Sequence, residues 1–335
     1  MTRAKRAVFY AAMFALVGVT ALAAVEILAR VVDPVGVSYY PETARYMDTL
    51  VREEALGYRN RAGLSGRFYG APVKINALGM RDRELPLDPA PGEFRVAIVG
   101  DSFPFGIGVP YEQSIPAFVE KTLNATAPVG TSFTTLNFGV PSYNTEQELL
   151  QFEQLGERLR PKAVVLLFAL NDIYPKNWVF EKRRGFVTDL AQRSYAISLV
   201  FALYRLSQAA KSNPAIVPGL ELYEPDNPRW LAIDRSMTAL SARCKVLGIP
   251  LVVMPSDLFE RKSVTMVRDV GAREGFPVVN IVPWKDPRWQ SLDPKAFMNS
   301  RVDSHPNAAG SEIYGRMIAE ELQRLGAVPS TAPPR

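Results

Sequence analysis

One serine and the only histidine of the chain have the types and settings needed for nucleophilic catalysis. Ser102 follows the apolar run 96–99 through Gly100 and Asp101, and His305 lies some two hundred residues further on. A serine on a sharp turn after a buried strand is presented as a nucleophile, and it needs a base to take its proton. If that base is a histidine, it must be His305. The pair predicts attack on a carbonyl carbon and a covalent acyl-serine intermediate.

A carboxylate lies close to the histidine in the sequence. Asp303 stands two residues before His305. Because residues i and i+2 of an extended segment share a face, this carboxylate could fix the tautomer of the imidazole and stabilise the imidazolium. Pro306 and Asn307 mark the start of a last helix, so the histidine lies at an element boundary. A lone histidine is more often structural than catalytic, but this setting favours catalysis.

Two further positions could supply hydrogen-bond donors. Gly139 follows a second apolar strand and Asn171 follows a third. Since the carboxyl ends of parallel strands meet at one edge of a sheet, both should lie near Ser102. The N–H groups of Ser102 and Gly139 and the Asn171 amide would then surround a developing oxyanion. Taken singly, Gly139 is better explained as a turn and Asn171 as a strand-end cap, and only their joint placement favours an oxyanion hole.

The surrounding segments alternate short apolar strands with helices. Strands that are apolar throughout are typical of a parallel sheet that helices cover on both faces. The sequence therefore predicts an α/β fold with a central parallel sheet. The expected strands are 94–99, 133–138, 163–170, 250–254 and 277–281, and the expected helices are 114–123, 146–159, 230–247, 263–274 and 308–325.

The N-terminus carries one candidate membrane segment. Arg3, Lys5 and Arg6 precede an uncharged apolar stretch at 7–25, close to the ~20 residues that cross a bilayer. A cleaved signal peptide is the alternative, but the stretch is long for one, which favours a retained anchor. Basic residues before a span keep the start of the chain in the cytoplasm. We therefore expect a single-pass protein of the bacterial inner membrane with a periplasmic C-terminal domain.

The whole chain divides into four expected parts. These are an N-terminal transmembrane anchor or uncleaved signal at 1–31, a linker or small hairpin region at 32–92 that packs on the domain, a catalytic domain at 93–327, and a flexible tail at 328–335. An aromatic and basic insertion at 172–228 interrupts the domain after a strand end, where it could be a lid, a substrate wall or a surface decoration. Its apolar stretch at 195–206 is expected to pack within the protein rather than on a bilayer or another protein.

Composition excludes several classes of function. The 39 basic and 34 acidic residues give a net charge of +5 without basic clusters, so a nucleic-acid partner is not expected. Cys244 is the only cysteine, which excludes an intramolecular disulfide, and its setting is typical of a buried helix face. One histidine without clustered ligands predicts no metal site, and no cofactor is expected.

Together these motifs resemble the SGNH (GDSL-type) hydrolase superfamily, and in particular its membrane-anchored bacterial members. The resemblance implies a flavodoxin-like three-layer sandwich and a serine esterase or acyltransferase activity. It assigns Ser102 as nucleophile, His305 as base, Asp303 as its orienting acid, and Ser102, Gly139 and Asn171 as the oxyanion hole. The matching motifs, in the family's order across 94–325, are Gly100-Asp101-Ser102, Gly139, Asn171-Asp172 and residues 303–307, and the segment 76–81 resembles one that is common in anchored members.

The chain departs from the family pattern at three places. Ala169 stands where a glycine is usual before the asparagine, and Ser142 stands where a second glycine often follows the first. Asp303 and His305 are spaced by two residues rather than three. If Asp303 did not complete the triad, a serine–histidine dyad helped by a backbone carbonyl would still function, more slowly.

Two functions from different classes remain open at this point. The first is an exported serine esterase, O-acyl hydrolase or acyltransferase that acts on an acetylated glycan or a lipid ester. The second is a non-catalytic accessory or scaffold subunit that docks onto a membrane protein complex. The intact set of serine, glycine, asparagine and histidine favours the enzyme.

Overall fold

A parallel four-stranded sheet in the order β6-β5-β7-β8 forms the centre of the computed structural model, which describes residues 2–33, 35–182, 185–209, 219–256 and 261–331. The strands are β5 (Glu93–Gly100), β6 (Ser132–Asn137), β7 (Ala163–Leu167) and β8 (Leu251–Val253). All four lie where the apolar runs predict them. Their carboxyl ends therefore meet at one edge, as the placement of the candidate residues requires.

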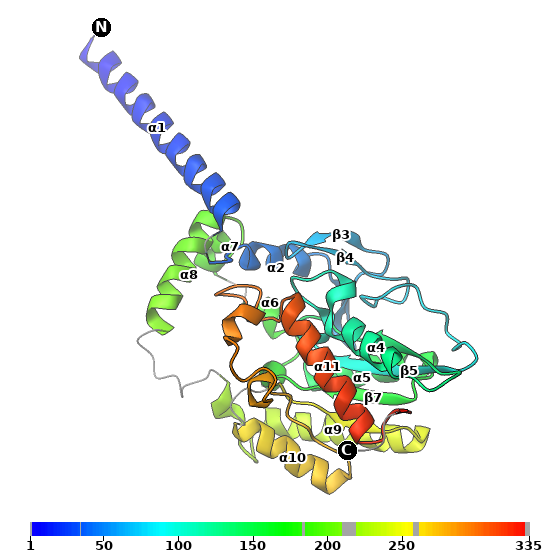
Figure 1. Cartoon of the computed structure of the whole chain (residues 1–335). Helices are drawn as coiled ribbons and strands as arrows, with labels where there is room; N and C mark the ends of the chain where they lie inside the picture. The colour runs from blue at the N-terminus through cyan, green and yellow to red at the C-terminus, as the bar shows by residue number, and fades with distance from the viewer. Residues whose placement is uncertain (1, 34, 183–184, 210–218, 257–260, 332–335) are drawn as a thin grey trace.

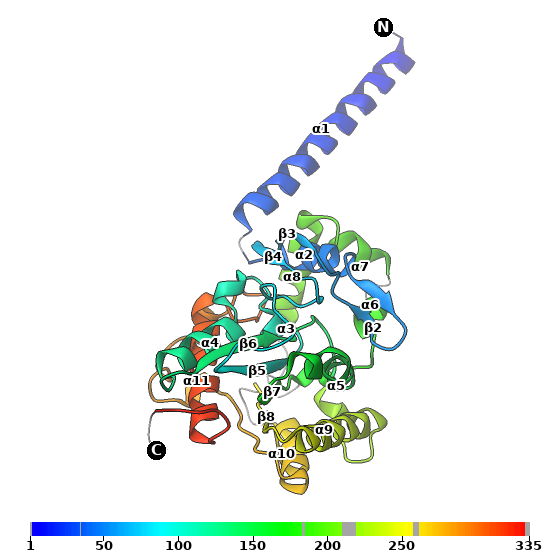
Figure 2. The ribbon, with the colours of Figure 1, turned by 90° about the vertical axis from the view of Figure 1, so that its right-hand side faces the viewer.

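Both faces of the sheet are covered by helices, so the predicted three-layer α/β sandwich is confirmed (Figures 1 and 2). Alternate residues of β5 point to opposite cores: Val96 and Ile98 pack under one layer, and Ala97 and Val99 under the other. The first layer is α4 (Ile115–Ala125) and α11 (Ala308–Arg324). The second is α5 (Thr145–Gln151), α9 (Pro228–Leu247) and α10 (Lys262–Glu274).

The segment 277–281 runs beside β8 but does not form the expected fifth strand. Val279 donates its N–H to the Val253 carbonyl at 3.0 Å, and Val278 makes a single parallel bridge with Val253. Neither Pro277 nor Pro255 has an N–H to donate, so the ladder is limited to this one pair, although Ile281 still donates its N–H to the Pro255 carbonyl at 2.8 Å.

Region 32–92 contains more structure than the expected linker or small hairpin. It forms α2 (Tyr39–Met47) and two antiparallel hairpins, β1 (Val51–Glu53) with β2 (Gly57–Arg59) and β3 (Ser65–Phe68) with β4 (Ala71–Lys74). Its buried side chains, Tyr46 and Tyr58 among them, lie in one apolar cluster with Phe105 and Tyr143 of the α/β sandwich. Because α2 is only nine residues long, it is this packing, rather than its own sequence pattern, that stabilises it.

The insertion contains α6 (Trp178–Lys182), α7 (Phe186–Ala191) and α8 (Tyr195–Ala209), and its described residues form no strand. The chain ends differently from expectation, because Val328 is buried against the helix layer rather than frayed. The last four residues of the expected tail, 332–335, lie outside the described part of the chain.

The helix α1 (Arg3–Val32) projects from the rest of the molecule (Figure 1). An 18-residue window within it has a mean hydropathy of 2.2, and none of that window is buried. A helix of this length and composition can cross a bilayer, and a signal sequence would have the same properties.

Candidate active site

Ser102 lies in the first turn after β5, at the carboxyl edge of the sheet. Gly100 ends the strand, and a Cβ atom at this position would lie 3.1 Å from a backbone oxygen of β7, so glycine allows the two strands to approach. The short helix α3 (Ser102–Phe105) then begins. Its N-cap residue is Asp101, whose side chain accepts the Phe103 N–H at 3.1 Å. Ser102, the predicted nucleophile, therefore stands on the strand-to-helix turn that the sequence predicts.

The structure brings Ser102, His305 and Asp303 into one hydrogen-bonded chain. His305 Nε2 lies 2.7 Å from Ser102 Oγ, and His305 Nδ1 lies 2.5 Å from Asp303 Oδ1. The second carboxylate oxygen of Asp303 accepts the Asn299 side-chain amide at 3.0 Å. Because Asp303 holds a proton on Nδ1, Nε2 is the nitrogen that can accept the serine proton.

A tight turn brings the Asp303 carboxylate to the His305 imidazole despite their short spacing in the sequence. Asn299 donates its N–H to the His305 carbonyl at 2.9 Å, and Ser300 donates its N–H to the Asp303 carbonyl at 3.1 Å. Asp303 Oδ1 also accepts the backbone N–H of His305 at 3.1 Å. The carboxylate therefore reaches the imidazole although only one residue separates the two.

The environment of His305 shifts the pKa of its imidazole upward. Burial by itself lowers that pKa, but the hydrogen bond and charge of Asp303, with a smaller contribution from Asp101, outweigh the burial. Two aromatic rings also flank the imidazole, with ring centroids 5.9 Å away for Tyr39 and 6.0 Å away for Phe103. The side chain is thus held in place, and it keeps its proton to a higher pH than a free histidine does.

Asn171 reaches the site from the end of β7 by way of Asp101. Its Nδ2 atom donates to Asp101 Oδ2 at 2.9 Å, and the Ser102 hydroxyl lies 3.2 Å from the same oxygen. A side-chain amide carries two N–H groups, so one of them remains for a substrate oxygen.

The predicted contribution of Gly139 meets an obstacle in the structure. Its N–H donates to Asn137 Oδ1 at 2.9 Å, so this bond would have to break before Gly139 could donate to an oxyanion. A Cβ atom at Gly139 would lie 2.1 Å from the backbone nitrogen of Phe105. The observed reason for glycine here is therefore the close approach of α3.

Ser142, where the family often has its second glycine, adopts a left-handed backbone with φ of 65°. Glycine adopts this conformation freely, whereas a residue with a Cβ atom pays roughly 1–2 kcal/mol for it. Ser142 therefore departs from the family pattern in residue type but keeps the left-handed backbone conformation that glycine favours.

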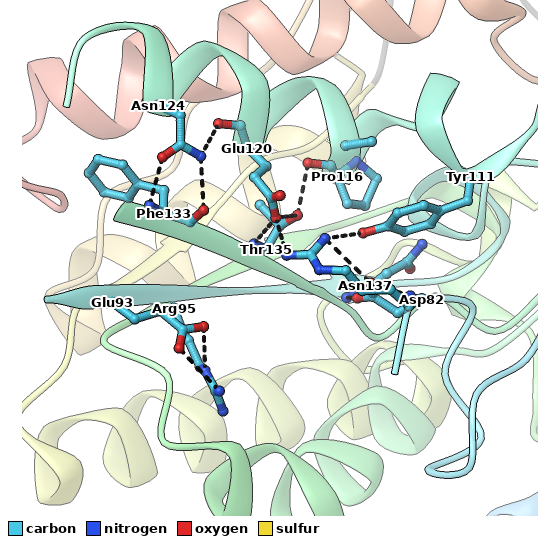
Figure 3. Close-up of polar contacts among 12 residues, drawn as sticks. Asp82, Glu93, Arg95, Tyr111, Pro116, Glu120, Asn124, Phe133, Thr135 and Asn137 are labelled. Atoms are coloured by element: carbon cyan, nitrogen blue, oxygen red, sulfur yellow. Dashed lines mark hydrogen bonds and ion pairs between the residues drawn. The ribbon is translucent and has the colours of Figure 1, made fainter. Parts of the chain in front are cut away.

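Several residues that hold the site lie in region 32–92 and give no catalytic signal in the sequence. Asp82 accepts the Asn137 N–H at 3.0 Å at the end of β6, as Figure 3 shows. Arg81 is buried and donates from Nη1 to the Phe105 carbonyl at 2.6 Å and from Nη2 to the Val109 carbonyl at 2.5 Å. Because these carbonyls follow Ser102 in the chain, Arg81 fixes the turn that carries Ser102.

Replacing Arg81 with methionine should therefore disturb both folding and catalysis. The change leaves several buried carbonyl oxygens without a donor, at a cost of about 3–5 kcal/mol. We expect a clear fall in the melting temperature and a loss of kcat of roughly tenfold or more, because the nucleophile is less well positioned. Thermal unfolding and ester turnover would measure the two effects. The exposed Arg61→Met is the matched control, and equal behaviour of the two variants would contradict the role given to Arg81.

Two buried carboxyls, Glu148 and Asp172, lie behind the site. Both oxygens of Glu148 and Oδ1 of Asp172 have no hydrogen-bond partner among the described residues. Burial raises the pKa of both groups, and nearby negative charge adds to the effect: that of Asp172 and Asp101 on Glu148, and that of Asp101 on Asp172. The folded protein thus holds protons that the unfolded chain releases.

The free energy of unfolding should therefore fall as the pH rises above the pKa of a glutamate in the unfolded chain. For one retained proton the fall is up to about 1.4 kcal/mol per pH unit. Glu148→Gln carries no such proton, so its stability relative to the native chain should increase between pH 5 and pH 8. Chemical unfolding in detergent at both pH values would measure this. The exposed Glu146→Gln on the same helix should show no such trend, and a pH-independent difference for Glu148→Gln would contradict the explanation.

A cavity of about 240 Å³ lies next to the hydrogen-bonded chain. It adjoins Phe103, Asn171 and Ser304, and aromatic rings of Phe168, Trp284, Phe297 and Tyr314 contribute to its wall. No described residue of the insertion after residue 172 lines it, so the lid interpretation gains no support from this cavity. In the described ranges, no group of three or more His, Cys, Asp or Glu side chains could hold a metal ion.

A comparison with known protein families agrees with the motifs. The model of the GDSL-like Lipase/Acylhydrolase family matches residues 98–313, well over half of the chain. A lipase/acylhydrolase from Enterococcus faecalis is similar in structure, with 14% identity and a TM-score of 0.43, over 72% of this chain and 100% of that one. A catalytic mutant of an acetylxylan esterase from Geobacillus stearothermophilus shows 14% identity and a TM-score of 0.44, over 72% and 97%. No curated protein matches the chain.

Proposed function

The chain belongs to the GDSL-like lipase/acylhydrolase family, and from that premise we propose that it is a membrane-anchored serine hydrolase or acyltransferase that acts through an acyl-Ser102 intermediate. The observation that carries the proposal is the continuous hydrogen bonding from Asp303 through His305 to Ser102 Oγ. A serine, a base and a group that orients the base are the parts that acyl transfer needs.

In the first half-reaction, His305 Nε2 takes the proton of Ser102 while Oγ attacks the ester carbonyl carbon. The carbonyl oxygen becomes an oxyanion, for which the Ser102 N–H and the free N–H of the Asn171 amide are the proposed donors. His305 then gives its proton to the departing alcohol as the ester C–O bond breaks. The acyl group remains on Ser102.

In the second half-reaction, water or a sugar hydroxyl loses its proton to His305 and attacks the acyl carbon. The bond to Ser102 Oγ breaks, and the proton returns to the serine. Asp303 stays ionised throughout and stabilises the imidazolium each time it forms. Hydrolysis and transfer therefore differ only in which acceptor reaches the acyl-enzyme.

We also propose that α1 stays in the membrane and that the catalytic domain is exported. The exposed apolar surface of α1 supports an anchor, and the basic residues Arg3, Lys5 and Arg6 before the span favour a periplasmic domain in a bacterial inner membrane. The ester would then be an acetylated glycan or a lipid. The apolar wall of the neighbouring cavity suits the acyl or alkyl part of either substrate.

A fluorophosphonate probe tests the proposal directly. The detergent-solubilised full chain should become covalently modified, and mass spectrometry should locate the adduct on Ser102. A series of p-nitrophenyl esters from acetate to longer chains would then measure acyl preference. Adding a sugar acceptor would separate transfer from hydrolysis, because transfer gives an acylated sugar in place of free acid. An unmodified protein that cleaves no ester would instead support the non-catalytic scaffold.

A further inference from the structure

The helix α8 presents a row of apolar side chains to solvent. Val200, Leu203 and Tyr204 are 69%, 51% and 61% exposed. Their spacing of three and four residues puts them on one face of the helix, which we call the α8 stripe. The opposite face is buried, since Ser198 and Ala202 are fully covered and Ala202 packs against the segment that follows α1. The expected packing within the protein therefore holds for one face of α8 only, and the stripe is a second apolar face that remains exposed.

A glutamate of α1 holds the start of α8. Glu26 accepts hydrogen bonds from the Ser194 hydroxyl at 2.7 Å and from the N–H groups of Tyr195 and Ala196, both at 3.0 Å. These are N–H groups that the first turn of a helix leaves without an internal partner, so Glu26 acts as an N-cap supplied by another helix. Glu26 is also the first charged residue after the apolar stretch 7–25. The start of α8 therefore lies at the depth where the proposed membrane span ends.

The surroundings of this junction suit a membrane surface. The Arg30 guanidinium lies 5.0 Å from the centre of the Tyr195 ring, and both Arg30 and Arg193 are exposed. Tyrosine and arginine are typical of the interface between hydrocarbon and water, where arginine attracts anionic lipid head groups. In Figure 1, α8 starts beside the end of α1 and runs across its direction along the outside of the molecule.

We propose that the α8 stripe lies on the surface of the same bilayer that α1 crosses. The inference rests on the proposed anchor. The bilayer is the occupant that the structure favours, because Glu26 already fixes the start of α8 at its boundary, whereas nothing else places a second protein there. An apolar helix face in the interface adds a second membrane contact to the span. The exported domain would then be unable to rotate freely about α1, and its active site would keep a fixed orientation to the membrane.

Nitroxide labels on the full chain in phosphatidylcholine–phosphatidylglycerol vesicles test this placement. The native thiol does not interfere, because Cys244 is buried and burial raises its pKa to about 12. Four single variants are needed: Leu203→Cys on the stripe, Arg205→Cys on another side of the same helix, Val246→Cys on the exposed surface of α9, and Leu16→Cys within the span. Frequent collision of a label with oxygen indicates that the label lies in lipid, and frequent collision with a soluble nickel chelate indicates that it lies in water.

The label at position 203 should collide with the nickel chelate at least about threefold less often than the label at 246, and it should remain accessible to oxygen. The label at 205 should resemble the one at 246. If the labels at 203 and 246 were equally accessible to nickel while the label at 16 was protected, the inference would be overturned but the proposed anchor would stand. Protection of 203 from both reagents would also overturn it, because a protein partner would then cover the stripe. A nickel-accessible label at 16 would overturn the anchor and the inference together.

Discussion

Replacing Ser102 with alanine is expected to lower kcat for ester cleavage by about 10⁴-fold or more. The alanine has no oxygen to form the acyl-enzyme, so neither half-reaction can proceed by the proposed route. Among the described residues, the hydroxyl makes two hydrogen bonds, with His305 Nε2 at 2.7 Å and with Asp101 Oδ2 at 3.2 Å. The fold should therefore survive the change, and fluorophosphonate labelling should disappear with the activity.

The controls for this variant separate chemistry from folding. Circular dichroism and the melting temperature of Ser102→Ala should match those of the native chain. Ser236→Ala removes another mostly buried serine hydroxyl, on α9, and should keep full turnover and labelling. If Ser102→Ala still formed an adduct or cleaved the same esters at the native rate, another group would have to be the nucleophile.

The sheet could be predicted because its strands are buried on both faces. A strand such as β5, which is apolar from Val96 to Val99, has no other stable place than the middle of an α/β sandwich. Region 32–92 gave no comparable signal. Its helix α2 is amphipathic only over nine residues, and its apolar side chains become buried only when Phe105 and Tyr143 of the sandwich meet them. Such packing depends on contacts between distant segments, which periodicity does not report.

The candidate site was predictable to the extent that strand ends fix position. Ser102 and Asn171 follow β5 and β7, and the structure places both beside Asp101. Local hydrogen bonds were not predictable. Whether the Gly139 N–H is free for a substrate or already bonded to Asn137 Oδ1 depends on the side-chain rotamer of Asn137, and residue spacing carries no information about that rotamer. The contribution of Gly139 to an oxyanion hole therefore stays a prediction, with an observed competitor for its N–H.

The variant Asp303→Asn is expected to lose about 10⁴-fold in kcat while the serine and the histidine remain. In the native chain, the Asp303 carboxylate accepts a hydrogen bond from Nδ1 of His305 and leaves Nε2 free to act as the base. An asparagine amide can instead donate to Nδ1, which favours the tautomer with its proton on Nε2, facing Ser102. That tautomer cannot accept the serine proton.

The pH profile distinguishes this role of Asp303 from a merely structural one. His305 must be neutral to act as the base, so activity should fall as the pH drops through the pKa of His305. Asp303 raises that pKa, and its replacement should therefore move the acidic limb of kcat/KM to lower pH. Stopped assays of p-nitrophenyl ester cleavage between pH 4 and 9 would measure the shift, with the exposed Asp269→Asn on α10 as the control. A variant that keeps the native limb and loses only a few-fold in rate would show that Ser102 and His305 work as a dyad without this carboxylate.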